Sequence, residues 1–172
     1  VAGSPCRRGG APMSAPGDPG GSDLGRLITP ERILLGLNPG GKRQLLQELS
    51  AIAAVRLGMP AETILAALQQ RERLGTTGIG DGIAIPHAKL DGLAEMTGFL
   101  ARLVKPIDFE ALDGRPIDLV VLLLAPASEG TAHLKALARV ARLLRDPQLC
   151  ARLREEPTAA GVHALLGEGG GG

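Results

Sequence analysis

His87 is the residue of this chain best placed to do chemistry, because of the segment that precedes it. It ends the short apolar run Ile83-Ala84-Ile85-Pro86, which follows a glycine-rich loop. Pro86 fixes the local backbone and has no N–H group, so nearby carbonyl oxygens are available to hold one imidazole nitrogen. The other nitrogen then keeps a lone pair. Since an unperturbed histidine has a pKa of about 6.5, this imidazole is expected to be neutral and able to act as a nucleophile. The alternative is a histidine satisfied by backbone groups alone.

The loop before that run carries Gly75, Gly78, Gly80 and Gly82. It does not fit the dinucleotide-binding pattern, because Ile83 stands where G-x-G-x-x-G requires its third glycine and because the loop leads from a helix to a strand. It is not a P-loop either, since no Gly-Lys-Ser/Thr follows. Two interpretations remain: a conformationally permissive turn, or a bare backbone surface that lets a partner or a phosphoryl group approach the histidine.

His133 and Arg71 are the other candidates for binding an anion. His133 is expected in the first turn of a helix, where backbone N–H groups and the helix dipole favour negative charge. It would bind phosphoryl oxygens beside His87, or else be an ordinary surface histidine. Arg71 is expected near a helix C-terminus, just before the glycine loop. It would either be a surface arginine that suits the helix dipole or stabilise charge on a transferring phosphoryl group.

Other chemistries have less support. The three histidines are scattered and show no short ligand spacing, so no metal and no cofactor is expected. His163 lies among small and apolar residues of the last expected helix, where a structural or solvated role is expected. Cys6 and Cys150 are too far apart in the sequence for a metal or redox motif, and Cys150 has no assigned base.

The composition narrows the class of protein. The 172 residues carry a net charge of +1 and contain two aromatic residues, Phe99 and Phe109, so a nucleic-acid partner is not expected. No apolar run is long enough to span a membrane, and none follows Arg7-Arg8, so neither membrane insertion nor a secretory signal is expected. A cytoplasmic location is the default expectation.

Three regions are expected along the chain. Residues 1–25 are rich in glycine and proline and are expected to be disordered. Met13 is a sensible natural start, which would make residues 1–12 an upstream extension. Residues 26–167 are expected to form one folded domain, and residues 168–172 a flexible glycine tail.

The elements expected within this domain predict an α/β (α+β) fold, a mixed β-sheet flanked by helices on both faces. The segment 117–124 is apolar at almost every position, which predicts a central strand covered on both sides. Further strands are expected at 33–37, 83–85 and 98–104, and helices before Gly58 and at 60–73, 131–145, 147–155 and 158–166. The helix 131–145 is expected to bury a stripe of Leu134, Leu137, Ala141 and Leu144. Its basic face, either solvated or used for docking a partner, consists of Lys135, Arg139 and Arg142.

The run from Arg71 to His87 has the sequence Arg-Glu-Arg-Leu-Gly-Thr-Thr-Gly-Ile-Gly-Asp-Gly-Ile-Ala-Ile-Pro-His. Continued by Ala88-Lys89-Leu90, it resembles the phosphorylation-site signature of the type-2 IIA proteins of the bacterial phosphotransferase system, and it is closest to the nitrogen-regulatory branch, EIIA-Ntr. Further similarity lies in residues 106–113 and in Thr131-Ala132-His133-Leu134, so the resemblance covers essentially all of residues 27–167. Threonine at position 76 and alanine at position 88 depart from the serine and glycine common in the family.

This resemblance implies the EIIA type-2 fold and a phosphotransferase component, the phosphohistidine carrier of the nitrogen phosphotransferase system. His87 would accept a phosphoryl group from an HPr-like protein (NPr), His133 would be the second active-site histidine, and Arg71 the active-site arginine. The phosphorylation state would regulate target proteins such as transporters or sensor kinases. Two alternatives remain. One is a sugar-specific IIA component of fructose or mannitol type, which passes the phosphoryl group to a IIB domain. The other is a non-catalytic binding module whose histidines are structural.

Overall fold

A six-stranded mixed β-sheet forms the centre of the protein, in a computed structural model that describes residues 22–169. Its strands are β1 Ile33–Leu37, β2 Gly78–Gly80, β3 Ile83–Ala84, β4 His87–Leu90, β5 Thr97–Ile107 and β6 Ile117–Pro126. They lie in the order β1-β5-β6-β3-β2, and β4 pairs with β6 further along the same edge as β3. β5 is antiparallel to β6, whereas β1 is parallel to β5, and both β3 and β4 are parallel to β6.

Strand β6 lies in the middle of this sheet and is buried along its length, apart from the half-buried Asp118. Successive side chains of a strand point to opposite faces, and those of β6 enter two different apolar clusters. One cluster takes Leu119, Val121 and Leu123, and the other takes Val120, Leu122 and Leu124. The sequence-based prediction of a central strand covered on both sides is therefore confirmed.

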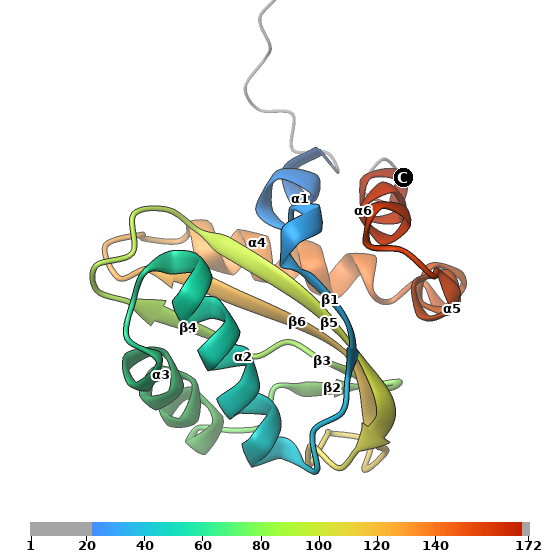
Figure 1. The fold of residues 1–172 in the computed structure, drawn as a ribbon, viewed down its shortest axis with the longest axis horizontal. Coiled ribbons are helices and arrows are strands. Elements are labelled where there is room, and N and C mark those ends of the chain that lie inside the picture. Colours follow the sequence, from blue (N-terminus) through green and yellow to red (C-terminus); the bar gives the residue numbers. More distant parts are fainter. Residues whose placement is uncertain (1–21, 170–172) are drawn as a thin grey trace, which may run out of the picture.

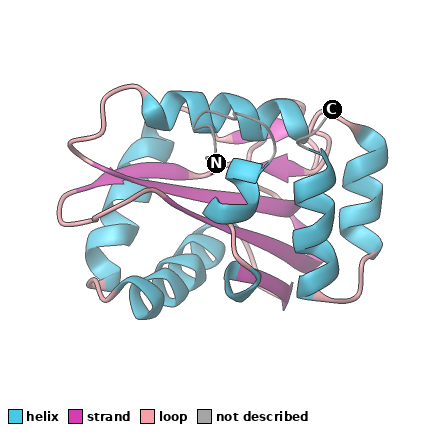
Figure 2. Ribbon diagram, turned by 90° about the horizontal axis from the view of Figure 1, so that it is seen from above, coloured by secondary structure: helices cyan, strands magenta, loops and turns pink. Residues whose placement is uncertain are grey.

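Helices cover both faces of the sheet, as Figures 1 and 2 show. α2 (Lys42–Leu57) and α3 (Ala61–Arg73) pack together over one face. Four helices contribute to the apolar cluster on the other face: α1 (Ser22–Leu27), α4 (Ala132–Leu143), α5 (Pro147–Glu155) and α6 (Ala159–Gly169). A 3₁₀ turn, η1 (Pro30–Arg32), leads into β1. The predicted fold class, a mixed sheet flanked by helices on both faces, is confirmed.

The folded part extends further at both ends than the composition predicts. α1 begins at Ser22, inside the stretch 1–25 expected to be disordered, because Leu24 and Ile28 pack into the cluster that includes α6 and are only 2% and 1% exposed. α6 continues to Gly169, so residues 168 and 169, which are expected to belong to a flexible tail, are helical. Residues 1–21 and 170–172 lie outside the described residues, and with them the expectations for Met13, Arg7-Arg8 and Cys6.

Three local predictions also need correction. The glycine loop contains the short edge strand β2, which is antiparallel to β3. His87 does not merely follow a strand; it begins β4, where it pairs with Leu123 of β6. On α4 the buried positions are Ala136, Val140 and Leu143, whereas Leu134 is 54% exposed. The rest of the expected stripe does face the core, because Leu144 is 3% exposed and Leu137 and Ala141 pack against the same apolar cluster; only Leu134 departs from it.

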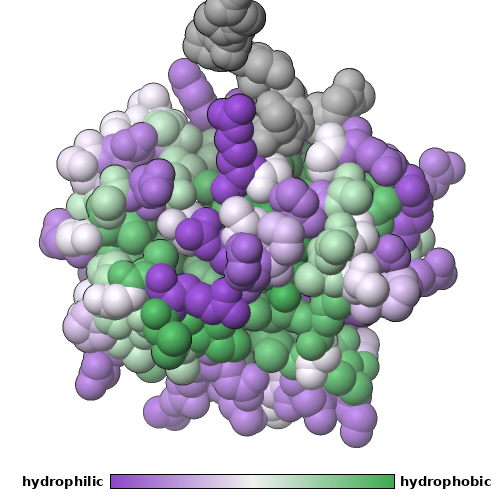
Figure 3. All heavy atoms as spheres, turned by 45° about the horizontal axis from the view of Figure 1, so that its top comes forward, coloured by the Kyte–Doolittle hydropathy of each residue, from purple (hydrophilic) through white to green (hydrophobic). Residues whose placement is uncertain are grey.

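The surface mixes hydrophilic and apolar side chains. Figure 3 shows one face, with hydrophilic residues around its outline and a band of apolar surface across its lower half. The large apolar side chains that the described part of the chain exposes are Val55, Leu74, Ile79, Val104, Leu112 and Leu134. No helix between residues 22 and 169 is long and apolar enough to cross a membrane.

Candidate active site

Three elements that are distant in the sequence meet at one depression on the surface. Arg71 comes from the last turn of α3, His87 from the first position of β4, and His133 from the first turn of α4. All three line a depression of about 570 Å³, whose rim includes the exposed side chains of Leu74 and Leu134. The structure thus brings together the three residues that the sequence singles out as a candidate site.

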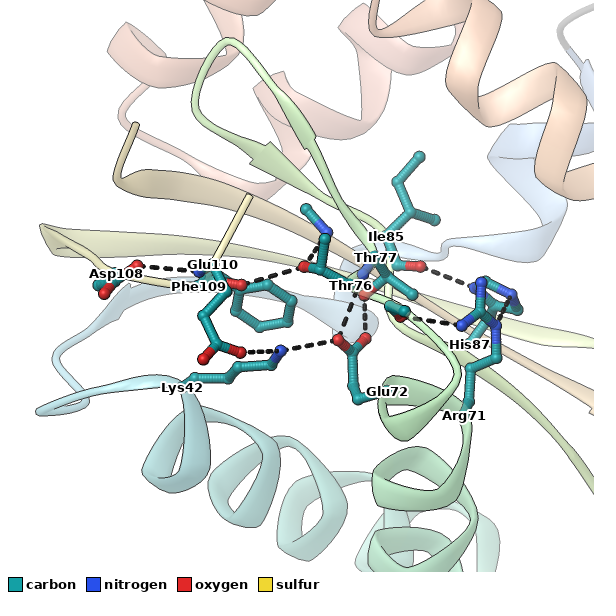
Figure 4. A network of polar contacts seen from close by, with 12 residues as sticks. Lys42, Arg71, Glu72, Thr76, Thr77, Ile85, His87, Asp108, Phe109 and Glu110 are labelled. Carbon is teal, nitrogen blue, oxygen red and sulfur yellow. Dashed lines mark hydrogen bonds and ion pairs between the residues drawn. The ribbon is translucent and has the colours of Figure 1, made fainter. Parts of the chain in front are cut away.

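The two ring nitrogens of His87 have different partners. Nδ1 lies 2.8 Å from the carbonyl oxygen of Ile85. Because a carbonyl oxygen can only accept, Nδ1 carries the proton and donates it. Nε2 therefore has the lone pair, and it accepts a hydrogen bond from Arg71 Nε at 3.1 Å (Figure 4). The geometry assigns the neutral Nδ1–H tautomer, and Ile85 supplies the backbone carbonyl that the position of Pro86 predicts.

The surroundings of His87 also keep it neutral. Burial lowers the pKa of His87 below its usual value, because it disfavours the charged imidazolium. The hydrogen bond to the Ile85 carbonyl and the negative charge of Glu72 raise the pKa, whereas the positive charge of Arg71 lowers it, and the net shift is downward. His87 is consequently an uncharged base at neutral pH, with its proton on Nδ1 and its lone pair on Nε2.

Arg71 is held by the loop that follows its own helix. Its Nη1 donates to the carbonyl oxygen of Gly75 at 3.0 Å, while its Nε donates to His87. The last turn of α3 closes here, because Leu74 N donates to the carbonyl oxygen of Arg71. A guanidinium carries five N–H donors in a planar fork, so these two hydrogen bonds leave others for an anion in the depression.

The glycines of the loop shape its backbone rather than the depression. Gly80 and Gly82 have φ angles of 113° and 80°, which other residues rarely adopt. A Cβ on Gly78 would come within 2.9 Å of Ala111, so the close approach of these two segments requires a glycine. Of the two interpretations of this loop, the permissive turn therefore describes Gly78, Gly80 and Gly82. Gly75 contributes to the site through its carbonyl oxygen.

His133 reaches the depression with one ring nitrogen unsatisfied. Its Nδ1 is buried and has no hydrogen-bond partner among the described residues. The N-cap residue of α4, Thr131, makes no side-chain cap hydrogen bond, which leaves N–H groups of the first turn available. Buried polar atoms normally have partners. Because this Nδ1 is buried, a visiting group in the depression would meet the rest of the His133 ring.

Beside the site lies a largely buried ion pair that the sequence does not predict. Glu72 accepts hydrogen bonds from the backbone N–H of Thr77, at 3.2 Å, and from the Thr77 hydroxyl, and it pairs with Lys42 Nζ at 2.9 Å. Lys42 also contacts Glu110 and lies 4.6 Å from the centre of the Phe109 ring (Figure 4). The sequence contains one indication of this ion pair. Glu72 stands in the last turn of a helix, where a carboxylate is unfavourable for the helix dipole and needs a compensating positive partner.

The remaining candidates lie outside the depression. His163 Nε2 donates to the carbonyl oxygen of Gly25 at 2.8 Å. Of the two roles expected for His163, structural or solvated, this contact supports the structural one. Cys150 is buried, and burial raises the pKa of its thiol, so it is a poor nucleophile. Within residues 22–169, no group of three or more histidine, cysteine, aspartate or glutamate side chains is arranged to hold a metal ion.

Known proteins share this fold and sequence pattern. Residues 26–169 match the family described as phosphoenolpyruvate-dependent sugar phosphotransferase system, EIIA 2. A nitrogen regulatory protein of Bradyrhizobium diazoefficiens is 51% identical over 140 residues, which cover 81% of this chain and 92% of the relative. Another, from Pseudomonas aeruginosa, is 38% identical over 144 residues, covering 83% and 94%. The crystal structure of nitrogen regulatory protein IIA-Ntr from Neisseria meningitidis superimposes with a TM-score of 0.79 at 30% identity, over 83% of this chain and 98% of that one.

Proposed function

The chain belongs to the EIIA 2 family of the phosphoenolpyruvate-dependent sugar phosphotransferase system, and we propose that it is a phosphohistidine carrier of the nitrogen branch, phosphorylated on His87. The family and the fold that the sequence resemblance implies are both confirmed. One observation carries the choice of acceptor: His87 keeps its proton on Nδ1, bound to Ile85, and presents the Nε2 lone pair at the depression beside Arg71.

The chemical step is the transfer of a phosphoryl group between two imidazoles. The Nε2 lone pair of His87 forms the new bond to phosphorus, while the P–N bond of the donor's phosphohistidine breaks and its electron pair returns to the donor ring. No base has to remove a proton first, because the lone pair is already present. The Nδ1 proton stays in its hydrogen bond to the Ile85 carbonyl, which stabilises the positive charge that develops on the ring.

Arg71 changes partner during this step. In the structure its Nε binds the nucleophilic lone pair, so attack requires the guanidinium to move from Nε2 to the incoming phosphoryl oxygens. There its planar donors stabilise the charge spread over those oxygens. His133 lines the same depression, and a ring N–H that faces it supplies another hydrogen bond to them.

The donor is an HPr-like carrier protein of the nitrogen branch (NPr). Leu74 and Leu134 on the rim of the depression are 82% and 54% exposed. Large apolar side chains grouped around a polar centre are typical of a protein-binding surface. A docked donor would cover them and exclude water from the phosphoryl group while it moves between the two histidines.

A regulatory role is favoured over sugar transport. The two relatives compared above, at 51% and 38% identity, are both nitrogen regulatory proteins. Phosphorylation of His87 adds negative charge to the depression, which changes its affinity for any protein that docks there. The targets regulated in this way are proteins such as transporters or sensor kinases.

A reconstituted phosphotransfer chain tests this function. The wild-type protein, incubated with phosphoenolpyruvate, the first enzyme of the system and NPr, should gain one phosphoryl group by mass spectrometry, and the His87→Ala variant should gain none. A His87→Ala variant phosphorylated at the wild-type rate would overturn the assignment. A wild-type protein that accepts no phosphoryl group would favour the non-catalytic binding module. Rapid donation from the phosphorylated protein to a IIB domain would favour the sugar-specific component.

A further inference from the structure

We propose that Glu72 is a positioning residue for phosphoryl transfer at His87. It acts through Thr77 and Ile85, which together fix the ring in the Nδ1–H form that leaves Nε2 nucleophilic. The kinetic part of this proposal rests on the proposed function, in which His87 is the phosphoryl acceptor. Two consecutive residues at the end of α3 then act on the two ring nitrogens of His87. Arg71 contacts Nε2 directly, and Glu72 acts on Nδ1 indirectly, through Thr77 and Ile85.

A continuous series of contacts connects Glu72 to His87. The Glu72 carboxylate accepts from the N–H of Thr77 at 3.2 Å and from the Thr77 hydroxyl. The carbonyl oxygen of Thr77 accepts from the N–H of Ile85 at 2.9 Å. The carbonyl oxygen of Ile85 accepts from His87 Nδ1 at 2.8 Å (Figure 4). Each contact fixes the position of the next residue, so the Ile85 carbonyl lies where it does partly because Thr77 is held.

The segment between Thr77 and Ile85 depends on such an anchor. The ladder between β2 and β3 is short, since β2 has three residues and β3 has two. β3 is held on its other side by β6, whereas β2, which follows Thr77, is the last strand in the sheet order. Thr77 is 4% exposed, and Glu72 binds both its backbone and its side chain. Without the carboxylate, Thr77 would lose two of its hydrogen bonds, and the Ile85 N–H would lose its fixed acceptor, the Thr77 carbonyl oxygen.

The charge of Glu72 is compensated where it lies. Its side chain is 7% exposed, and Lys42 Nζ lies 2.9 Å from it. Burial lowers the pKa of Lys42, but hydrogen bonds to Glu72 and Glu110 raise it, and the net shift is upward, so the ammonium stays charged. Apolar residues of the same shape often stabilise a fold as well as a buried ion pair does. The pair at this place is therefore better explained by the hydrogen bonds that Glu72 makes to Thr77.

The tautomer of His87 is what these contacts protect. If the Ile85 carbonyl drifts away, the proton is free to move to Nε2. The ring would then lack a lone pair at the depression, and its new N–H would face the N–H of Arg71. Displacements of about 1 Å at a reacting group slow catalysis by on the order of 100-fold, so loss of this anchor should lower the rate of transfer rather than the affinity for the donor.

Isosteric variants test the proposal kinetically. Glu72→Gln removes the charge with little change in shape, and Thr77→Val removes the hydroxyl donor, whereas Thr77→Ser keeps it. Glu110→Gln is the matched control, because Glu110 also contacts Lys42 but its side chain is 75% exposed. With phosphorylated NPr as donor, kcat should fall by roughly 10- to 100-fold in Glu72→Gln and Thr77→Val, with KM unchanged. Thr77→Ser and Glu110→Gln should transfer at nearly the wild-type rate.

Nitrogen-15 NMR of the His87 ring tests the same proposal without any phosphoryl donor. The wild type should show the proton on Nδ1, and Glu72→Gln and Thr77→Val should show a larger share of Nε2–H. Folded variants with the wild-type tautomer and the wild-type kcat would overturn the proposal. So would a loss of rate that Thr77→Ser shares and that follows the fraction of unfolded protein. If the wild type accepts no phosphoryl group, the proposed function fails, and the ring spectra still decide whether Glu72 positions His87.

Discussion

Arg71 Nε lies 3.1 Å from His87 Nε2 and donates a hydrogen bond to it, so the guanidinium covers the lone pair of the proposed nucleophile. This relationship has two physical consequences. It keeps the nucleophilic nitrogen occupied until a more strongly negative group, such as a phosphoryl group, competes for the guanidinium. It also places a positive charge beside the imidazole, which together with burial lowers the pKa of His87.

Replacement of Arg71 by glutamine should therefore affect both transfer and titration. The rate of transfer should fall by about 100-fold, the usual effect of losing one donor to a developing anion. The pKa of His87 should rise, because a positive neighbour is lost. Arg71→Lys should keep the pKa of His87 low, because lysine retains the positive charge. It should not recover the full rate of transfer, because lysine lacks the planar fork of donors. NMR titration of His87 and single-turnover phosphorylation measure the two effects. An Arg71→Gln variant with an unchanged pKa and rate would rule out a role for this contact.

The lowered pKa of His87 predicts how stability depends on pH. Its main cause is burial, so the folded pKa lies below the value of about 6.5 expected in the unfolded chain. Between these two pKa values the unfolded state binds more protons, and the free energy of unfolding rises with pH. The wild type should accordingly lose stability relative to His87→Gln as the pH falls below about 6.5. Urea unfolding of both proteins across this pH range measures the difference. A wild type that gains stability relative to His87→Gln on acidification would show that the pKa of His87 is raised in the folded protein, not lowered.

His133 should affect the rate of transfer without being required for it. The His133→Ala variant removes a ring that lines the depression and carries an unpartnered buried Nδ1. Since the nucleophile is untouched, His87 should still be phosphorylated completely, but at a rate lower by roughly 10- to 100-fold. A time course of phosphorylation by phosphorylated NPr gives both quantities. Wild-type kinetics in this variant would remove His133 from the site.

The apolar rim should matter for the donor and not for the fold. Leu74 and Val55 are equally exposed, at 82%, but only Leu74 lines the depression. Leu74→Asp should raise the KM for phosphorylated NPr by about tenfold, corresponding to roughly 1.4 kcal/mol of binding free energy. Val55→Asp is the matched control and should leave KM unchanged. Equal effects of both variants, or an effect of Leu74→Asp on the melting temperature alone, would mean that the donor docks elsewhere.

Much of this architecture is predictable from sequence because local patterns agree with the tertiary structure. The apolar segment 117–124 predicts the central strand, since a strand buried on both faces leaves no polar alternation. His87, Arg71 and His133 are recognisable because they stand at element ends, next to a glycine loop and a helix start. The helix start at His133 favours binding of anions, whereas the helix end at Arg71 favours a positive side chain.

The features missed depend on contacts between segments distant in the sequence. α1 forms inside a glycine-rich stretch because Leu24 packs against distant residues, which composition does not reveal. Which face of α4 is buried depends on the segments that pack against the helix. Leu134 lies outside that face and contributes to the rim of the depression. The role of Glu72 depends on Lys42 and Thr77 meeting it in space.

Identification of the phosphorylated atom tests the central claim most directly. The protein is labelled with nitrogen-15 in its histidines, phosphorylated through NPr, and the phosphorylated ring is assigned by NMR. His87 should carry the phosphoryl group, on Nε2, with the proton or hydrogen bond to Ile85 retained at Nδ1. A phosphoryl group on Nδ1 of His87, or on His133 or His163, would contradict the account.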